Sequence, residues 1–437
     1  MFTTRRQVLA GLAAAGATTA LSGYSFTSFA PMRINAQRLQ SHIEGLSVFG
    51  RPAGGTFADG VSRVAYSDAD VAGRKYVMAM MSAAGLEPRL DTAGNIFTSR
   101  PGTDPVAKPI LFGSHIDSVA NGGNFDGDLG SLAALEVLRT LNENKVATRH
   151  PLEAVIWQNE EGGLVGSSAV AGQALDLDRK YYGVPLAEGL RRIGGDPARL
   201  ADARKSPGWF HCYLEMHIEQ GGNLEKAGIP VGVVEGIVAI DDYDVEIRGF
   251  ANHAGTTPMP ERRNALLAAA RLIEAVQQIV TREPGRQVGT VGKLEVHPNA
   301  VNVIPGLVKH SIELRDLSAD KIAALGAQIS AEAARIAEAT GTTITLKKVR
   351  HNPPAMATSA LQAHVEEASA RLGLKTMRLP SGAGHDAQMM ARLGPMAMIF
   401  VPSVAGVSHS PKELTSWTDC ANGANVLLHT ILAADKT

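Results

Sequence analysis

The chain has little cysteine, and its positive and negative charges nearly cancel. Only Cys212 and Cys420 occur among the 437 residues, so we expect two free, buried thiols, with one bridge as the alternative. Lysine and arginine number 42, against 43 for aspartate and glutamate. Because no basic stripe or arginine-rich run is present, a nucleic-acid partner is not expected. The absence of low-complexity sequence and a hydrophobic content of 45% indicate well-packed globular structure.

The N-terminal segment lacks a hydrophobic run long enough for stable membrane insertion. An alanine-rich apolar stretch at residues 8–21 is shorter than the ~20 residues that a spanning helix needs. It follows the pair Arg5-Arg6, and paired arginines before a mildly apolar segment resemble a twin-arginine export signal. We therefore expect residues 1–30 to be a signal segment and the protein to be periplasmic. A basic tail on a cytoplasmic protein is the alternative.

The length of the chain and its hydrophobic patterning predict two domains. Short apolar runs at residues 109–112 and 152–157 have the character of buried parallel strands, with a helical pattern between them. Strand–helix–strand alternation favours an α/β domain built on a mostly parallel sheet. In such a sheet, active groups lie outside the carboxyl ends of the strands.

A different pattern begins near Asp242. Alternating residues there predict a strand, and a helical pattern follows at residues 265–276. Strands are expected at 288–296 and 307–314, a helix at 319–339 and a strand at 343–349. This order is βαββαβ, the ferredoxin-like unit. We expect it to be an insertion at residues 242–350 that divides the α/β domain into residues 31–241 and 351–437.

Five residues of the types that bind metals each stand just past an apolar run. They are His115, Asp126, Glu161, His217 and His409. Imidazole and carboxylate ligands at strand ends suit a borderline metal such as zinc, although manganese, cobalt or nickel can occupy such sites. Two ions held ~3.5–4 Å apart need a bridging carboxylate. Asp126 lies on a glycine-rich turn that can bring its carboxylate close to both ions.

Two further carboxylates accompany these residues. Glu160 directly precedes Glu161 and is a candidate general base. Asp117 follows His115 by two residues and is expected to point the same way on an extended segment. Its carboxylate is therefore expected to accept the second imidazole N–H of His115 and to select the ring tautomer.

These residues resemble the di-zinc amidohydrolases of the aminoacylase and carboxypeptidase superfamily. The chain is most similar to their hydantoinase/carbamoylase group, which includes N-carbamoyl-L-amino-acid hydrolases, β-ureidopropionases and allantoate amidohydrolases. The resemblance covers residues 34–434. Its most specific stretches are 113–119 (GSHIDSV), 121–127 (NGGNFDG), 215–221 (EMHIEQG), 253–259 (HAGTTPM) and 406–411 (GVSHSP). His217 itself favours this group, because other branches usually carry an aspartate there.

The resemblance implies how the metal residues divide between two zinc ions. One ion would be held by His115, Asp126 and His217, and the other by Asp126, Glu161 and His409. Glu160 would be the general base for attack by a metal-bridging hydroxide. The inserted βαββαβ domain would act as a lid and a dimerisation domain.

The resemblance also implies a set of substrate-binding residues. His253 would stabilise the oxyanion in the neighbouring subunit of a homodimer, with a surface-loop histidine as the alternative. Arg315 and Asn302 would recognise a substrate carboxylate, since a guanidinium can grip one with two parallel bonds. An ordinary ion pair with Asp316 is the alternative for Arg315. Gln220 and the backbone of Gly384 would contact the substrate.

We therefore expect a hydrolase that releases an L-amino acid from a small carboxylate-bearing N-carbamoyl or related N-acyl derivative. Allantoate amidohydrolase is the first alternative, and an amidase or peptidase acting on small conjugates or dipeptides is the second. A binding protein on an inactive scaffold would lack a ligand or the base, and none is missing. The segment 160–167 (EEGGLVGS) departs from the group, because it is shorter and lacks an Arg-Phe pair.

A fusion of residues 1–30 to a reporter enzyme tests the export signal. The native segment should direct the reporter to the periplasm. Arg5→Lys combined with Arg6→Lys should block export, because this route reads the arginine pair. Reporter activity in periplasmic and cytoplasmic fractions gives the result, and export that survives both substitutions would contradict a twin-arginine signal.

Overall fold

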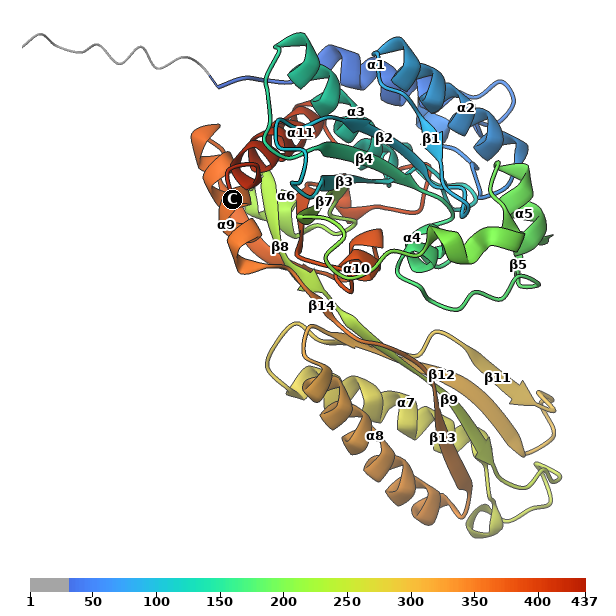
Figure 1. Ribbon diagram of the computed structural model, residues 1–437. Helices are drawn as coiled ribbons and strands as arrows, with labels where there is room; N and C mark the ends of the chain where they lie inside the picture. The colour runs from blue at the N-terminus through green and yellow to red at the C-terminus, as the bar shows by residue number, and fades with distance from the viewer. Residues whose placement is uncertain (1–30) are drawn as a thin grey trace, which may run out of the picture. The chain divides into compact units, whose positions relative to one another are not determined.

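Strands that alternate with helices build a nine-stranded, mostly parallel sheet in the computed structural model, which describes residues 31–437 (Figure 1). The predicted signal segment at residues 1–30 lies outside the described residues and stays a prediction. The strand order is β1-β2-β4-β3-β7-β16-β8-β14, with β15 paired to β8. The strands are β1 (Arg89–Leu90), β2 (Ile96–Arg100), β3 (Ile110–His115), β4 (Leu152–Trp157), β7 (Cys212–Ile218), β8 (Val231–Ile237), β14 (Ala355–Met356), β15 (Thr376–Ser381) and β16 (Met396–Val401).

The centre of this sheet is parallel and fully buried. Strands β4, β3, β7 and β16 are neighbours and run in the same direction. Every residue of these four strands is buried, which explains why their sequences are dominated by apolar residues. Both faces are covered by helices, so the predicted α/β class is confirmed.

Helices α3 and α11 cover one face of the sheet, and α4 and α10 lie on the other (Figure 1). The helices of this main domain are α1 (Ala36–Leu46), α2 (Asp68–Ala83), α3 (Asp128–Glu143), α4 (Val165–Val170), α5 (Leu186–Arg192), α6 (Asn223–Ala227), α9 (Ser359–Arg371), α10 (Asp386–Met390) and α11 (Trp417–Ala434), with short 3-10 turns at Phe57–Asp59, Pro197–Ala203 and Val404–Gly406. Gly130 lets α3 approach β7 closely, because a Cβ there would lie 2.0 Å from the carbonyl oxygen of Met216.

A second, five-stranded antiparallel sheet forms the inserted domain, which spans residues 239–352. Its strands are β9 (Ala239–Arg248), β10 (Val288–Thr290), β11 (Leu294–His297), β12 (Leu307–Asp316) and β13 (Thr343–Asn352). Helices α7 (Ala265–Arg282) and α8 (Ala319–Thr340) pack together over one face, and the 3-10 turn Met259–Glu261 precedes them (Figure 1).

The βαββαβ order is as the sequence predicts, with one difference. The strand expected at residues 288–296 is divided into β10 and β11, which both pair with β12. Gly292 lies between them and weakens a continuous strand, since glycine has no side chain to pack.

Cys212 and Cys420 are both free and buried, which confirms the expected thiols. Within residues 31–437, none of the helices is both long and apolar enough to cross a membrane.

Candidate metal centre

The carboxyl ends of neighbouring parallel strands bring the five metal-type residues together. His115 is the last residue of β3, and His217 is the penultimate residue of β7. Glu161 follows β4, and His409 lies on the loop after β16. Asp126 precedes α3, which starts at Asp128. These strand ends lie at one edge of the sheet, and in parallel α/β sheets the active groups lie at that edge.

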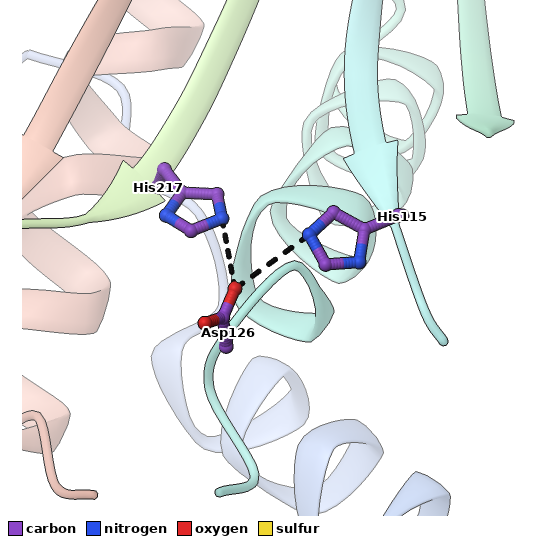
Figure 2. Close-up of side chains that lie close together, drawn as sticks. All are labelled: His115, Asp126 and His217. Atoms are coloured by element: carbon purple, nitrogen blue, oxygen red, sulfur yellow. Dashed lines mark ion pairs between the residues drawn. The ribbon is translucent and has the colours of Figure 1, made fainter. Parts of the chain in front are cut away.

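The carboxylate of Asp126 lies at the middle of this group. Its Oδ1 is 3.6 Å from His115 Nε2 and 3.1 Å from His217 Nε2 (Figure 2). Its Oδ2 is 3.3 Å from His409 Nε2, and that nitrogen is 3.5 Å from Glu161 Oε2. The two oxygens of one carboxylate therefore serve two separate ligand clusters, as a bridging carboxylate must.

Backbone hydrogen bonds orient the two buried imidazoles. His115 Nδ1 is 3.0 Å from the carbonyl oxygen of Asp117, and His217 Nδ1 is 2.9 Å from that of Ile218. A carbonyl oxygen only accepts, so each Nδ1 carries the proton and donates. Each Nε2 is then left with its lone pair directed toward Asp126, which is the tautomer that a metal ligand needs.

The role of Asp117 differs from the sequence prediction. Its main-chain carbonyl oxygen accepts from His115 Nδ1 at 3.0 Å, whereas its carboxylate lies 3.8 Å from the same nitrogen, beyond hydrogen-bond distance. The carboxylate instead accepts from the backbone N–H groups of Glu160, at 3.1 Å, and Glu161, at 3.2 Å. Asp117 therefore positions the segment that carries the candidate base.

The residues present fit a pair of metal ions. The ligand atoms of His115, Asp126 and His217 lie within 4.8 Å of one another, and so do those of Asp126, Glu161 and His409. Among residues 31–437, Glu161 Oε1 and His217 Nε2 are buried and have no hydrogen-bond partner. Buried polar atoms without partners are costly unless a ligand satisfies them. Mixed imidazole and carboxylate donors suit zinc, manganese, cobalt and nickel alike.

Charge coupling within the site shifts the pKa values of its members. Burial acts to raise the pKa of Asp126, but His217 and the other imidazoles outweigh it and hold this pKa well below its ordinary value. The hydrogen bond with Asp126 raises the pKa of His409 to about 9. Burial, together with the negative charge of Asp126, raises the pKa of Glu161 to about 7.

Glu160 has the position and the environment of a proton carrier. Its Oε2 lies 3.7 Å from His115 Nε2, beside the ligand cluster rather than within it. Burial raises its pKa well above the ordinary value, although His115 opposes the shift. A carboxyl group with a raised pKa can both accept and return a proton near neutral pH.

Glu413 is a site residue that the sequence does not reveal. Its Oε1 accepts from the backbone N–H groups of Phe125 and Asp126, both at 3.0 Å. Its Oε2 accepts from the hydroxyl of Ser408 at 2.8 Å, and this hydroxyl also lies 3.1 Å from Asp126 Oδ2. Glu413 therefore ties the glycine-rich turn to the loop that carries His409. It stands two residues after the 406–411 stretch and outside each of the motifs, so its type and position alone do not mark it as a site residue.

A cavity of about 510 Å³ opens beside these groups. Residues of both domains line it: Asp126, Glu160, Glu161, Gly163, Leu164, Arg179, His217, Gln220, Ile240, Arg315, Arg350, Asn352, Ala383, Gly384, His385, Gln388 and His409. Of the residues expected to bind substrate, Gln220, Arg315 and Gly384 line this cavity. Gln220 Nε2 donates to Asp126 Oδ2 at 2.7 Å. The guanidinium of Arg315 pairs with Glu313, at 2.8 Å, rather than with Asp316.

His253 and Asn302 lie together on the inserted domain but do not line this cavity. The backbone N–H of Ala254 donates to the carbonyl of Asn302 at 2.9 Å. His253 is exposed, and its Nδ1 accepts from the N–H groups of Gly255, at 3.0 Å, and Thr256, at 3.1 Å. Because Nδ1 accepts, Nε2 carries the proton and is free to donate.

Several residues around the site adopt a left-handed backbone without being glycine. The φ angles are 50° at Asn159, 59° at Leu164, 57° at Gln220 and 53° at His409. Such conformations are uncommon for residues with a Cβ and cluster at functional sites. At Gln220 and His409 the backbone turns the side chain toward Asp126.

Comparison with known proteins identifies the family. Residues 111–433 match the peptidase family M20/M25/M40. The chain is 41% identical over 407 residues to an N-carbamoyl-L-amino acid amidohydrolase of Geobacillus stearothermophilus, covering 91% of this chain and 98% of that relative. It is 35% identical over 398 residues to an allantoate amidohydrolase of Bacillus subtilis, covering 89% and 95%.

A solved structure agrees with these relatives. A hydantoinase/carbamoylase family amidase from Burkholderia multivorans is 37% identical, with a TM-score of 0.85 and coverage of 93% of this chain and 99% of that chain. The chain belongs to the peptidase family M20/M25/M40. It is a metal-dependent hydrolase that acts on carbon–nitrogen bonds other than peptide bonds, and the resemblance inferred from the sequence is confirmed.

Metal binding should release protons and weaken as the pH falls. His409, with a pKa of about 9, and Glu161, with a pKa of about 7, must lose their protons to act as ligands. The apparent affinity should fall as the pH is lowered from about 9 and more steeply below about 7, because protons compete first for His409 and then for Glu161, and the raised pKa values of His115 and His217 add to this competition.

Titration calorimetry of the metal-free protein with zinc, in two buffers of different ionisation enthalpy, measures this release. His364→Asn is a suitable control. It removes a histidine of helix α9 that belongs to neither ligand cluster. An affinity that does not change with pH, together with a binding enthalpy that is the same in the two buffers, would exclude the assignment of these two ligands.

Proposed function

We propose that the protein releases an L-amino acid from its N-carbamoyl derivative by hydrolysing the ureido carbon–nitrogen bond. The observation that carries this proposal is the shared carboxylate of Asp126, with Glu160 beside it, at one end of a cavity that also contains Arg315. The relative at 41% identity, named as an N-carbamoyl-L-amino acid amidohydrolase, supports the same substrate class.

The ligand assignment follows the two oxygens of Asp126. In this proposal His115, Asp126 and His217 hold one ion, and Asp126, Glu161 and His409 hold the other. A pair of such ions supplies a polarising charge for the scissile carbonyl and brings the pKa of water toward neutrality. Glu413 and Asp117 hold the two ligand-bearing segments in place through backbone N–H groups.

Glu160 moves the proton. It accepts a proton from the attacking water as the carbon–oxygen bond forms, and then donates it to the amino nitrogen as the carbon–nitrogen bond breaks. The amino acid and carbamate leave, and carbamate breaks down to carbon dioxide and ammonia. Burial of Glu160 keeps its pKa high enough for the second step.

The carboxylate of the substrate is recognised at the opposite side of the cavity. Arg315 binds Glu313 through one guanidinium edge, with Nε at 2.8 Å and Nη2 at 3.0 Å, and its Nη1 donates to the carbonyl oxygen of Gly382 at 2.6 Å, which fixes its plane. One N–H of Nη1, one N–H of Nη2 and the backbone N–H of Gly384 would remain for the substrate carboxylate, since both residues line the cavity. Gln220 would contact the ureido group from beside Asp126.

His253 completes the site from a second subunit in this proposal. Its Nε2–H is a suitable donor for the oxyanion, but in its own subunit the residue does not line the cavity. Asn302 lies beside His253 and would enter the partner subunit's cavity together with it. A homodimer in which each inserted domain reaches the partner's cavity explains why these two residues are exposed.

Allantoate is the second candidate substrate. A relative named allantoate amidohydrolase is 35% identical over nearly the same length, and allantoate carries a carboxylate and ureido groups. The short loop that contains Gly163 and Leu164 lines the cavity, so the size of the accepted group depends on this wall.

The proposed activity is tested by assaying a panel of substrates with the native protein and with a variant that lacks the general base. The metal-loaded protein should hydrolyse N-carbamoyl-L-amino acids in preference to N-formyl and N-acetyl amino acids, allantoate, β-ureidopropionate and dipeptides. Glu160→Gln should lower kcat by about 10²- to 10⁴-fold, because it removes the proton carrier. Metal content should not change, because Glu160 is outside both ligand clusters.

Glu188→Gln is the matched control, because it makes the same change at an exposed position of helix α5. Undiminished turnover in Glu160→Gln would disprove the assigned base. Hydrolysis of dipeptides or allantoate alone would disprove the substrate class.

Mixed dimers test the shared site. His253→Ala and Glu160→Gln are each expected to be nearly inactive. When the two are unfolded together and refolded, about half of the dimers should be mixed, and each of these should contain one intact site. Recovery of up to about a quarter of the native activity is therefore expected, measured by ammonia release. A fully active monomer in sedimentation experiments, or no recovery on mixing, would contradict the shared site.

A further inference from the structure

Three arginines line the cavity, and two of them have carboxylate partners. Arg315 is paired with Glu313, and Arg350 with Asp242 at 2.8 Å. Arg179 differs from both. Within residues 31–437, its guanidinium makes no ion pair and no side-chain hydrogen bond, although the residue lines the same cavity as the metal centre. A fixed cation without a protein counter-charge is available to an anionic ligand.

A tight hairpin presents Arg179 to the cavity. The residue directly precedes β5 (Lys180–Tyr181), which pairs with β6 (Val184–Pro185). The two connecting residues, Tyr182 and Gly183, have φ angles of 50° and 88°. Two consecutive positive φ angles are typical of a type I′ turn, which matches the twist of the paired strands. The direction of the chain at Arg179 is therefore set by regular structure.

Contacts with the ring of Tyr181, and of that ring with Tyr66, hold the guanidinium of Arg179 in place. Arg179 Cζ lies 5.1 Å from the centroid of the Tyr181 ring, a cation–π distance. Tyr181 is buried and meets Tyr66 edge to face at 6.2 Å. The hydroxyl of Tyr66 accepts from Asn159 Nδ2 at 3.1 Å, and Asn159 directly precedes Glu160. Arg179 is thus connected to the strand end that carries the base.

The short loop after Glu161 makes this arrangement possible. A Cβ at Gly162 would lie 2.7 Å from a ring carbon of Tyr181, so only glycine lets the ring pack there. The cation–π contact with Tyr181 uses none of the N–H groups of Arg179, which leaves them free for bonds in the plane of the guanidinium. Arg179 is therefore prepared to bind a planar anion from the cavity side.

The cavity then contains two separate binding points for carboxylates. In the proposed function Arg315 takes the α-carboxylate of the substrate, while Glu160 and Glu161 belong to the metal centre. A volume of about 510 Å³ is in the range that holds small ligands, so a dicarboxylate fits.

We infer that Arg179 determines specificity by binding a carboxylate on the substrate side chain. The preferred substrates are then N-carbamoyl derivatives of acidic L-amino acids. This inference rests on the proposed function, and it identifies the side chain that the enzyme selects.

A matched pair of substrates tests the inference. N-carbamoyl-L-glutamate and N-carbamoyl-L-glutamine have the same shape and differ in one charge. The wild-type protein should favour the glutamate derivative in kcat/KM. Arg179→Gln should reduce the ratio of the two kcat/KM values by about 10- to 100-fold, the usual effect of losing a hydrogen-bonded charge pair. Arg179→Lys should retain part of the preference, because it keeps the charge but not the two parallel bonds.

Lys180→Gln is the matched control. It removes a positive charge from the next residue of the hairpin, which is exposed and does not line the cavity. The glutamate-to-glutamine ratio should stay at the wild-type value in this variant. An equal preference in the wild-type protein, an unchanged ratio in Arg179→Gln, or an equal loss in Lys180→Gln would each overturn the inference.

A binding measurement separates this inference from the proposed function. If no N-carbamoyl amino acid is hydrolysed, the proposed function fails, and binding to the metal-loaded Glu160→Gln protein then decides about Arg179. Calorimetry should show tighter binding of N-carbamoyl-L-glutamate than of the glutamine derivative, and Arg179→Gln should abolish the difference. Equal binding of the two compounds would overturn the inference by this route as well.

Discussion

One carboxylate, that of Asp126, determines how the rest of the site must be arranged. Its two oxygens face different ligand clusters, so the ends of β3, β4 and β7 and the loop after β16 have to meet around a single side chain. A run of adjacent parallel strands meets this requirement, because all their carboxyl ends lie at one edge. Glu413 completes the arrangement by fixing the backbone of Asp126 from the far end of the chain.

The two domains contribute different kinds of residue to the same cavity. The metal-type residues stand on buried strands and the loops directly after them, where packing limits their movement. Arg315 and Arg350 come from β12 and β13 of the inserted domain. In the proposed function the metal ligands and the base therefore all lie on the main domain, whereas the residues that recognise the substrate are divided between the two domains, because Gln220, Gly384 and Arg179 belong to the main domain.

The sequence predicts the parts of the site that depend on regular structure. Apolar runs identify β3 and β4, and the metal-type residues after them are recognisable because each follows such a run. The expected hydrogen bond from His115 to the Asp117 carboxylate is not formed, because residue spacing indicates only on which side Asp117 lies and not whether its side chain or its main chain is nearer to the imidazole. Glu413 and Arg179 act through contacts with residues far away in the chain or through a local hairpin, and neither kind of contact leaves a spacing pattern in the sequence.

The left-handed backbone at Gln220 and His409 has a consequence for how this enzyme can be stabilised. Each such residue raises the energy of the folded state by about 1 kcal/mol or more, and glycine would remove that strain. Glycine would also remove the amide or the imidazole beside Asp126. Ala405 also has a left-handed backbone, with φ of 54°, but its side chain is not a ligand. Replacing Ala405 with glycine would therefore remove the strain without removing a group from the metal centre. Thermal tolerance and turnover are therefore opposed at the metal centre, and any gain in heat resistance has to come from positions outside it.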